Sequence, residues 1–322
     1  MIISKQDPVL VIGGGSIGER HIGNLLRLGY THIVVLRSRM LPFRNLDPTH
    51  LTIVTDWESA LVLKPKVAFI CTPTSLHIEQ AIRCAQNGIS ILAEKPLSHN
   101  GEGVSELIDA CKKSGVYVQV GYMMRYHPLA EKIKTWIEDK SWGRLVSFST
   151  HWGEHLPDWH PWEDYRESYA ARKELGGGAA LTLSHDLDLV IWLMNSPLAK
   201  HHLIKNCTSG LEVNVDSAAD FLLAFENGVT GHVHLNFFQK VARREYLFEF
   251  TEASVCFDFF LNQILVKQKN ESETFRLENF ERNDLFLRQT EDFFNRLQTY
   301  SPEDTHQNIL DAARVVELCD PT

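Results

Sequence analysis

The fold of the chain's first part is decided by the stretch Val9-Leu10-Val11-Ile12-Gly13-Gly14-Gly15-Ser16-Ile17-Gly18. Four apolar residues, typical of a buried strand, lead into a G-x-G-x-x-G turn, and the apolar residues after the turn recur at helical spacing. Gly13 permits a tight turn, Gly15 lets a pyrophosphate approach the backbone, and Gly18 lets the helix pack on the strand. The helix N–H groups at Ser16 and Ile17 remain free for the anion. We therefore predict a dinucleotide-binding turn; the alternative is a glycine-rich turn in an ordinary α/β protein.

The residues after the second apolar run, 33–36, indicate which dinucleotide binds. A carboxylate about 20 residues after the glycines would hold the ribose 2′-hydroxyl of NAD, whereas arginine accommodates the 2′-phosphate of NADP. This chain has Arg37-Ser38-Arg39 and no acid there. Two guanidinium groups and a hydroxyl can hold a phosphate dianion, so we predict NADP(H) in preference to NAD(H). Alternatively, the arginines lie in a solvated loop and either cofactor binds.

Length and composition narrow the class of protein. With 322 residues, 44% of them hydrophobic, the chain can form two cores. Its net charge is -9 and it has no long run of Lys and Arg, which argues against nucleic acid as a partner. Six scattered cysteines without C-x-x-C spacing, and no recognisable export signal, predict a cytoplasmic protein. No apolar stretch reaches the roughly 18 residues of a membrane helix, so we expect no membrane partner.

The pattern of apolar runs predicts two domains. In residues 1–121, short apolar runs alternate with helical patterns, which predicts a Rossmann fold with a parallel sheet. In residues 122–322, Asn227-Gly228 between two strand-like runs indicates a hairpin. This half is predicted to be an α+β substrate-binding and oligomerisation domain with an open, mainly antiparallel sheet. Helices are expected to cover one face of that sheet, at residues 128–140, 184–194, 284–297 and 304–318.

Four polar residues alternate along the predicted strand at 229–237, namely Thr230, His232, His234 and Asn236. Two histidines at period two could hold a metal in principle, but no third ligand stands nearby at ligand-like spacing. We therefore predict no metal site and expect a solvated or subunit-facing sheet surface. We also predict no metal site at His151, Glu154, His155 and His160, because carbohydrate or cofactor contacts explain that segment better.

Three further motifs carry a family resemblance. Cys71-Thr72-Pro73-Thr74-Ser75-Leu76-His77 follows the third predicted strand, Glu94-Lys95-Pro96 follows the next, and Gly176-Gly177-Gly178 precedes Ser184-His185-Asp186-Leu187-Asp188. Together with the glycine motif, these resemble the glucose-fructose oxidoreductase and inositol dehydrogenase family (Gfo/Idh/MocA), through about residue 195. Residues 159–166 and 168–173 look like a subgroup associated with surface-polysaccharide and nucleotide-sugar gene sets.

The resemblance implies a dehydrogenase or reductase that transfers hydride between NAD(P) and a hydroxyl or keto carbon of a sugar or nucleotide-sugar. Lys95 would contact the reacting hydroxyl, since its charge favours a developing alkoxide, and His185 would be the acid/base. Pro96 would follow a cis peptide. The dinucleotide crevice would be lined by Thr72, Pro73, Thr74, His77, Glu94 and Lys95. Relatives often pair through the outer face of the second-domain sheet, so a homodimer or homotetramer is expected.

One departure from the family pattern leaves the proton path open. Many members carry an aspartate four residues before the histidine, and this chain has Thr182 or Leu181 there, depending on the end from which one counts. A threonine hydroxyl is not a useful base at neutral pH. His185 would then work alone or with Tyr165, Tyr169 or Asp186.

The expected substrate contacts also leave alternatives open. The side chains assigned to substrate are Arg125, Trp152, Tyr165, Arg166, Thr182 and His185. Aromatic rings and arginines suit a sugar that bears an anionic group, although the aromatic residues could equally be packing. Two other functions are possible: a catalytically silent NADP(H)-binding sensor or assembly subunit, or an enzyme whose nicotinamide oxidises and then re-reduces one sugar.

Overall fold

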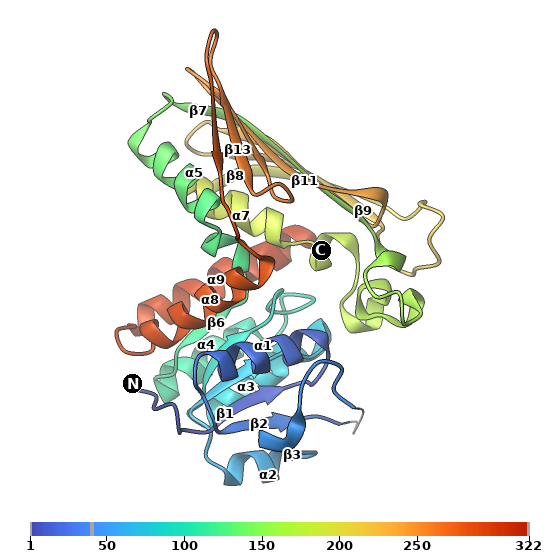
Figure 1. Cartoon of the computed structure of the whole chain (residues 1–322), viewed down its shortest axis with the longest axis vertical. Helices are drawn as coiled ribbons and strands as arrows, with labels where there is room; N and C mark the ends of the chain where they lie inside the picture. Colours follow the sequence, from blue (N-terminus) through green and yellow to red (C-terminus); the bar gives the residue numbers. More distant parts are fainter. Residues whose placement is uncertain (1, 39–41, 321–322) are drawn as a thin grey trace. The chain divides into compact units, whose positions relative to one another are not determined.

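A computed structural model describes residues 2–38 and 42–320 (Figure 1). The chain forms two compact units. The first contains the residues up to Gly121 together with Phe286–Glu317, and the second contains Tyr122–Leu285 together with the residues from Leu318 onward.

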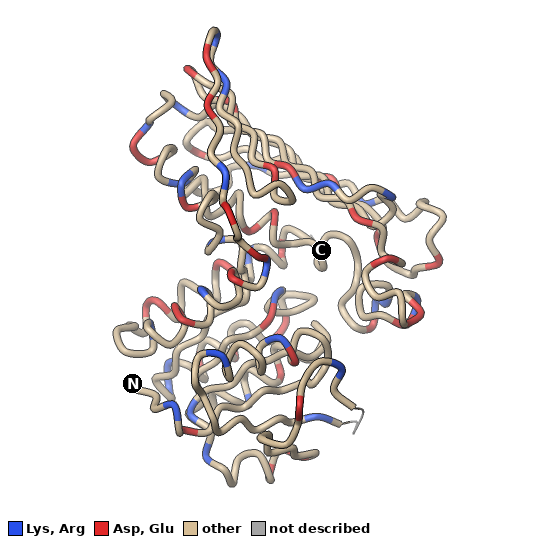
Figure 2. Tube along the Cα trace, viewed as in Figure 1, with Lys and Arg blue, Asp and Glu red and all other residues tan. Residues whose placement is uncertain are grey.

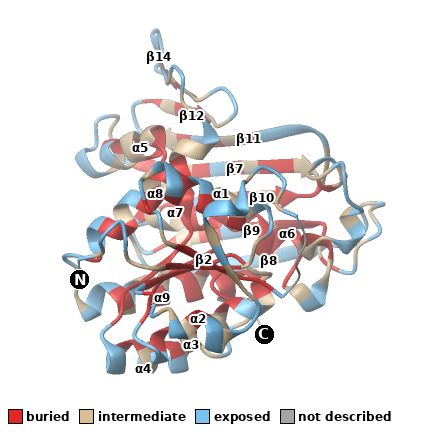
Figure 3. Ribbon diagram, turned by 60° about the horizontal axis from the view of Figure 1, so that its bottom comes forward, coloured by how far each residue is buried: buried red, intermediate tan, exposed pale blue. Residues whose placement is uncertain are grey.

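The first unit is built on a six-stranded parallel sheet in the order β3-β2-β1-β4-β5-β6. Its strands are β1 (Val9–Ile12), β2 (Ile33–Leu36), β3 (Leu51–Val54), β4 (Val67–Ile70), β5 (Ser90–Ala93) and β6 (Val118–Val120). Its helices are α1 (Ser16–Arg27), α2 (Trp57–Val62), α3 (His77–Gln86) and α4 (Val104–Ser114). Most of these strand residues are buried, as continuous apolar runs in a parallel sheet require (Figure 3). The predicted Rossmann fold is confirmed.

Two helices from the end of the chain complete the first unit, namely α8 (Arg282–Arg296) and α9 (Pro302–Cys319). Phe293 of α8 is fully buried and meets Phe69 of β4 edge to face, with ring centroids 5.6 Å apart. Asn308 of α9 donates to the backbone carbonyl of Val118 at 3.0 Å. The prediction from sequence that these two helices cover the second sheet is wrong. An amphipathic pattern shows that a helix buries one face, but it does not show against which sheet that face packs.

The second unit holds an eight-stranded sheet in the order β14-β13-β12-β11-β7-β10-β9-β8. Its strands are β7 (Leu145–His155), β8 (Leu198–Asn206), β9 (Ala218–Phe225), β10 (Thr230–Asn236), β11 (Phe238–Phe250), β12 (Ser254–Asp258), β13 (Gln263–Lys267) and β14 (Ser272–Arg276). Only β7 and β10 pair in parallel, and the other pairs are antiparallel. The predicted mainly antiparallel sheet is confirmed, including the hairpin at Asn227-Gly228, where Gly228 has a φ of 85°.

One face of this sheet is covered by α5 (Pro128–Asp139), α6 (Ala179–Thr182) and α7 (His185–Met194) (Figure 1). The inward-facing residues of β9 and β10, such as Phe221 and Val233, are fully buried. The opposite face carries Leu222 and the histidines of β10. Lysines and arginines are interspersed with acidic residues along both units (Figure 2). Within the described part of the chain, no helix has the length and apolar character needed to span a bilayer.

Candidate functional site

The glycine turn between β1 and α1 has the shape that its sequence predicts. Gly13 has a φ of 98°, and a Cβ there would lie 2.7 Å from the carbonyl oxygen of Cys71. A Cβ on Gly18 would collide with the carbonyl oxygen of Gly13, so the helix approaches the turn as closely as only glycine allows. A Cβ on Gly15 would meet nothing within 4 Å. Helix α1 starts at Ser16 without a side-chain cap, and Ile17 follows in its first turn. The turn therefore fits a pyrophosphate.

Arg37 follows β2 and lies against this turn. Its backbone is bonded to Val54 of β3, and the side chain is buried with its guanidinium 4.6 Å from the centre of the Phe43 ring. A Cβ on Gly14 would come within 3.4 Å of the Arg37 guanidinium, which places that charge beside the glycine turn. Ser38 is exposed, and Arg39 lies outside the described residues.

His77 holds the loop after β4 in place through a hydrogen bond to its backbone. Thr72 and Pro73 are half-buried and Thr74 is buried, and the Thr72 hydroxyl donates to Gln80 at 2.8 Å. His77 is only 1% exposed, and its two ring nitrogens lie 2.8 Å from the carbonyl oxygens of Thr72 and Pro96. His77 therefore ties the loop after β4 to the loop after β5.

Glu94 and Lys95 follow β5. The Glu94 carboxylate accepts a hydrogen bond from Nε2 of His21 at 2.8 Å and another from the backbone N–H of Lys95 at 3.3 Å. Burial raises the pKa of Glu94, but the hydrogen bond and charge of His21, with Lys95 and His77, lower that pKa below its ordinary value. Glu94 is thus an ionised carboxylate under the Lys95 loop. The Lys95–Pro96 peptide is cis, and the Lys95 side chain is partly exposed.

These three loops follow strands β1, β4 and β5, which are neighbours in the sheet. The carboxyl ends of parallel strands meet at one edge, so the glycine turn, the Thr72–Pro73 turn and Lys95 lie along the same edge. This is where a doubly wound sheet binds its ligand. The structure therefore brings together the cofactor-side residues that the sequence singled out.

His185 is the first residue of α7 in the second unit and is 4% exposed. Its ring centroid lies 6.0 Å from Tyr122 and 6.2 Å from Trp152. Thr182, in the preceding α6, is 2% exposed and brings no acid to this group. Tyr122 is an aromatic neighbour of His185 that the sequence did not single out, and burial raises the pKa of its hydroxyl well above the ordinary value.

Asp186 forms an ion pair with Arg244. It accepts hydrogen bonds from Nε of Arg244 at 2.9 Å and from the Tyr246 hydroxyl at 2.7 Å. Arg244 is 1% exposed and stacks 3.8 Å from the centre of the Trp152 ring. Trp152 therefore contacts both the buried Arg244 guanidinium and the His185 ring. These contacts favour a packing role for Trp152 over stacking against a sugar.

Arg125 is bound by a residue of α7. Its guanidinium forms a bidentate pair with Asp188, with Nε donating to Oδ2 at 2.9 Å. Asp188 is fully buried, whereas the side chain of Arg125 is 24% exposed. The pair joins residues Met123–Tyr126 to α7, so Arg125 has a structural partner.

Tyr165 and Arg166 lie in a run of short turns after β7. The Tyr165 hydroxyl accepts the backbone N–H of Glu212, and the exposed guanidinium of Arg166 bonds both Asp164 and Glu212. Arg172 is paired in the same way with Glu167 and Glu174. These arginines are neutralised by neighbouring carboxylates, so they do not support an anionic substrate group.

Several residues of these sites were not predicted. His21, Arg244 and Tyr246 contact candidate residues through pairs separated by 58 to 73 positions in the chain. In the sequence, each of these residues stands out only as a polar residue within an apolar pattern. That pattern does not indicate which distant residue it contacts. The same is true of Asp220, which supplies a third group beside His232 and His234.

Two family matches cover most of the chain. Residues 8–122 match the family described as "Oxidoreductase family, NAD-binding Rossmann fold", and residues 130–255 match the "GFO/IDH/MocA C-terminal domain". The two matches are consecutive and correspond to a nucleotide-binding oxidoreductase class. The chain belongs to the Gfo/Idh/MocA oxidoreductase family.

Curated relatives are between 24% and 33% identical to this chain over the aligned residues. An uncharacterized oxidoreductase, YrbE, of Bacillus subtilis (strain 168) is 29% identical over 239 residues, 70% of this chain and 66% of the relative. Levoglucosan dehydrogenase of Pseudarthrobacter phenanthrenivorans is 28% identical over 233 residues, 64% of this chain and 58% of the relative. The matched region thus spans 66% and 58% of these two relatives, less than two thirds of each.

Solved structures share the fold over nearly the whole chain. Levoglucosan dehydrogenase in complex with NADH and levoglucosan superimposes with a TM-score of 0.79 at 21% identity, covering 97% of this chain and 96% of the other. UDP-N-acetylglucosamine 3-dehydrogenase GnnA from Acidithiobacillus ferrooxidans gives 0.77 at 16% identity, covering 97% and 95%. At these identities the likeness shows the fold.

Proposed function

We propose that this protein is an NADP(H)-dependent dehydrogenase or reductase that acts on a CH–OH group of a sugar. The observation that carries the proposal is the placement of Lys95 on the same sheet edge as the glycine turn, two strands away. The first unit would bind the dinucleotide and the second the sugar. Relatives named levoglucosan dehydrogenase and D-xylose 1-dehydrogenase (NADP(+)) 2 support the substrate class.

The proposed chemistry divides between two residues. A nicotinamide, when bound, supplies the hydride acceptor or donor. Lys95 holds a positive charge at the hydroxyl and stabilises the oxygen as its proton leaves. His185 takes that proton in oxidation and returns it in reduction. Thr182 can orient a hydroxyl.

The preference for NADP(H) rests on Arg37. Its guanidinium beside Gly14 is positioned to meet a 2′-phosphate, and no acid follows β2 to repel one. We expect purified protein to bind NADPH at least tenfold more tightly than NADH. The Arg37→Gln variant should lose most of this preference for NADPH. The control is Arg27→Gln, at an exposed position at the other end of α1, which should retain the preference. Fluorescence titration measures both constants, and equal affinities in the wild type would contradict the NADP(H) proposal.

The role of Lys95 is tested separately by turnover. Lys95→Met should bind NADPH within a fewfold of the wild type and lose at least a hundredfold in kcat on any sugar that the wild type turns over, because charge stabilisation at the reacting oxygen is lost. Lys113→Met, on the exposed surface of α4, is the matched control. Nicotinamide absorbance with a panel of free and nucleotide-linked sugars gives the rates. Binding without turnover in the wild type would favour the catalytically silent sensor, or the enzyme whose nicotinamide oxidises and then re-reduces one sugar.

A homo-oligomer through the open face of the second sheet is part of the proposal. Leu222 and Ile204 are 53% and 54% exposed on this face, and Leu247 is 39% exposed. Strand register puts all three on one side of the sheet. Exposed aliphatic side chains that share one sheet face favour an interface, and a second copy of the chain is the partner we propose.

A further inference from the structure

Three polar side chains converge on the open face of the second sheet, the same face that exposes Leu222. His232 and His234 are two positions apart on β10, so the pleat puts both on the same face. Asp220 lies on β9 directly opposite His234. The sequence argued against a metal here because no third ligand stood nearby, and the antiparallel hairpin provides one.

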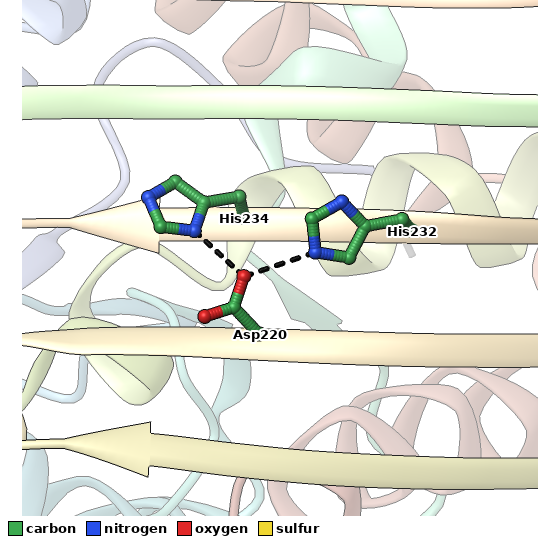
Figure 4. Close-up of side chains that lie close together, drawn as sticks. All are labelled: Asp220, His232 and His234. Carbon is green, nitrogen blue, oxygen red and sulfur yellow. Dashed lines mark hydrogen bonds and ion pairs between the residues drawn. The ribbon is translucent and has the colours of Figure 1, made fainter.

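The three groups point at one another (Figure 4). Oδ1 of Asp220 lies 2.9 Å from Nε2 of His232 and 2.7 Å from Nδ1 of His234. All three candidate ligand atoms lie within 4.8 Å of one another. In the single chain the side chains of His232, His234 and Asp220 are 39%, 22% and 35% exposed, so a cation can reach the group there and keep a water ligand.

The donor set selects a class of metal. Two imidazole nitrogens and one carboxylate oxygen are ligands that zinc and its neighbours prefer, whereas magnesium and calcium require mainly oxygen. The Asp220 carboxylate faces both imidazoles and would contribute negative charge to a cation.

We propose that Asp220, His232 and His234 bind one divalent transition-metal ion of the zinc type. The metal would replace the two N–H···O hydrogen bonds that the Asp220 carboxylate oxygen accepts from His232 and His234 in the metal-free protein. With metal–ligand bonds of about 2.0–2.2 Å, tetrahedral ligand atoms lie about 3.4 Å apart. Small rotations of partly exposed side chains reach this spacing, and the fourth position is left to water.

Asn236 limits the affinity of this site. Its Oδ1 accepts the backbone N–H groups of Phe238 and Gln239, which orients Nδ2 toward Nε2 of His234 at 3.1 Å. In the metal-free protein the proton of neutral His234 is thus on Nδ1. A metal at Nδ1 moves the proton to Nε2, where the Asn236 amide cannot accept it. A carboxylate at position 236 would accept that proton and support the metal-bound ring.

The test is direct metal binding by the full-length, untagged protein after removal of metals with a chelator. We expect one equivalent of Zn²⁺ to bind in calorimetry and Co²⁺ to give the visible absorption of a tetrahedral site, with no binding of Mg²⁺. His232→Ala and Asp220→Asn should weaken Zn²⁺ binding at least tenfold, and Asn236→Asp should strengthen it. The control is His202→Ala, an exposed histidine on the same face of β8, which should bind as the wild type does.

Two results would overturn the proposal. One is a wild-type protein without stoichiometric Zn²⁺ binding. The other is equal binding by the wild type, His232→Ala and Asp220→Asn, which would place the metal elsewhere on the chain. Circular dichroism of each variant establishes that the fold is retained. The measurement does not use enzyme activity, so it is independent of the proposed function.

Discussion

At the scale of single residues, the Lys95 loop depends on a buried charge. Glu94 is 7% exposed and still ionised, since His21 donates to it and the neighbouring cations favour its charged form. A buried carboxylate without such donors would be protonated instead. The hydrogen-bonded carboxylate therefore supports the loop geometry, because Glu94 also accepts the backbone N–H of Lys95. The motif E-K-P thus includes the lysine and the residue that supports it.

This arrangement predicts a pH dependence of stability. Because the pKa of Glu94 is lower in the folded chain than in the unfolded one, its contribution is complete above the unfolded value of about 4.3 and is lost as the pH falls through the folded value. Glu94→Gln should lower the free energy of unfolding by about 1–3 kcal/mol at pH 7. The difference from wild type should shrink as the pH falls below about 4.

Urea unfolding of the wild type and Glu94→Gln between about pH 7 and pH 3 measures this difference. Glu102→Gln is the control, since Glu102 is exposed in the same unit. A difference that stays constant across the pH range would show that Glu94 contributes by packing and not by charge.

At the scale of helices and strands, the sequence predicted what is local. The glycine turn, the alternating apolar runs and Asn227-Gly228 each determine a neighbouring backbone geometry, and each is found where expected. Partners distant in the chain were not predictable in this way. The pairing of Asp186 with Arg244, and of Asp220 with His234, is decided by strand order and register, which composition and spacing leave undetermined.

The position of α8 is the clearest case, and it can be tested. Phe293 lies in the core of the first unit with Phe69 and Tyr117, so Phe293→Ala should cost about 3–5 kcal/mol in the free energy of unfolding. Leu310→Ala, at an exposed position of α9, should change it by less than about 0.5 kcal/mol. Hydrogen exchange of Phe293→Ala should speed up in β1 and β4. Faster exchange in β9 and β10 alone would place α8 against the second sheet after all.

At the scale of the whole molecule, the two units have different kinds of surface. In the first unit, helices and loops surround a sheet whose central strands are buried, and the proposed ligand edge is the functional surface. In the second, one sheet face is covered by helices, and the other exposes aliphatic residues around the Asp220 cluster. An antiparallel sheet can have one solvated face, but exposed leucine and isoleucine on it favour a partner.

This surface leads to a prediction about assembly. Light scattering of the purified wild type should give the mass of a dimer or tetramer, and Leu222→Glu should give a monomer, since a charge in an apolar interface is left desolvated without a partner. Leu222 is half exposed, so the substitution should leave the melting temperature of the separated chain nearly unchanged. Val62→Glu, at a 77% exposed position of α2 in the first unit, should assemble like the wild type. A monomeric wild type, or a Leu222→Glu variant with the wild-type mass, would exclude this face as the interface.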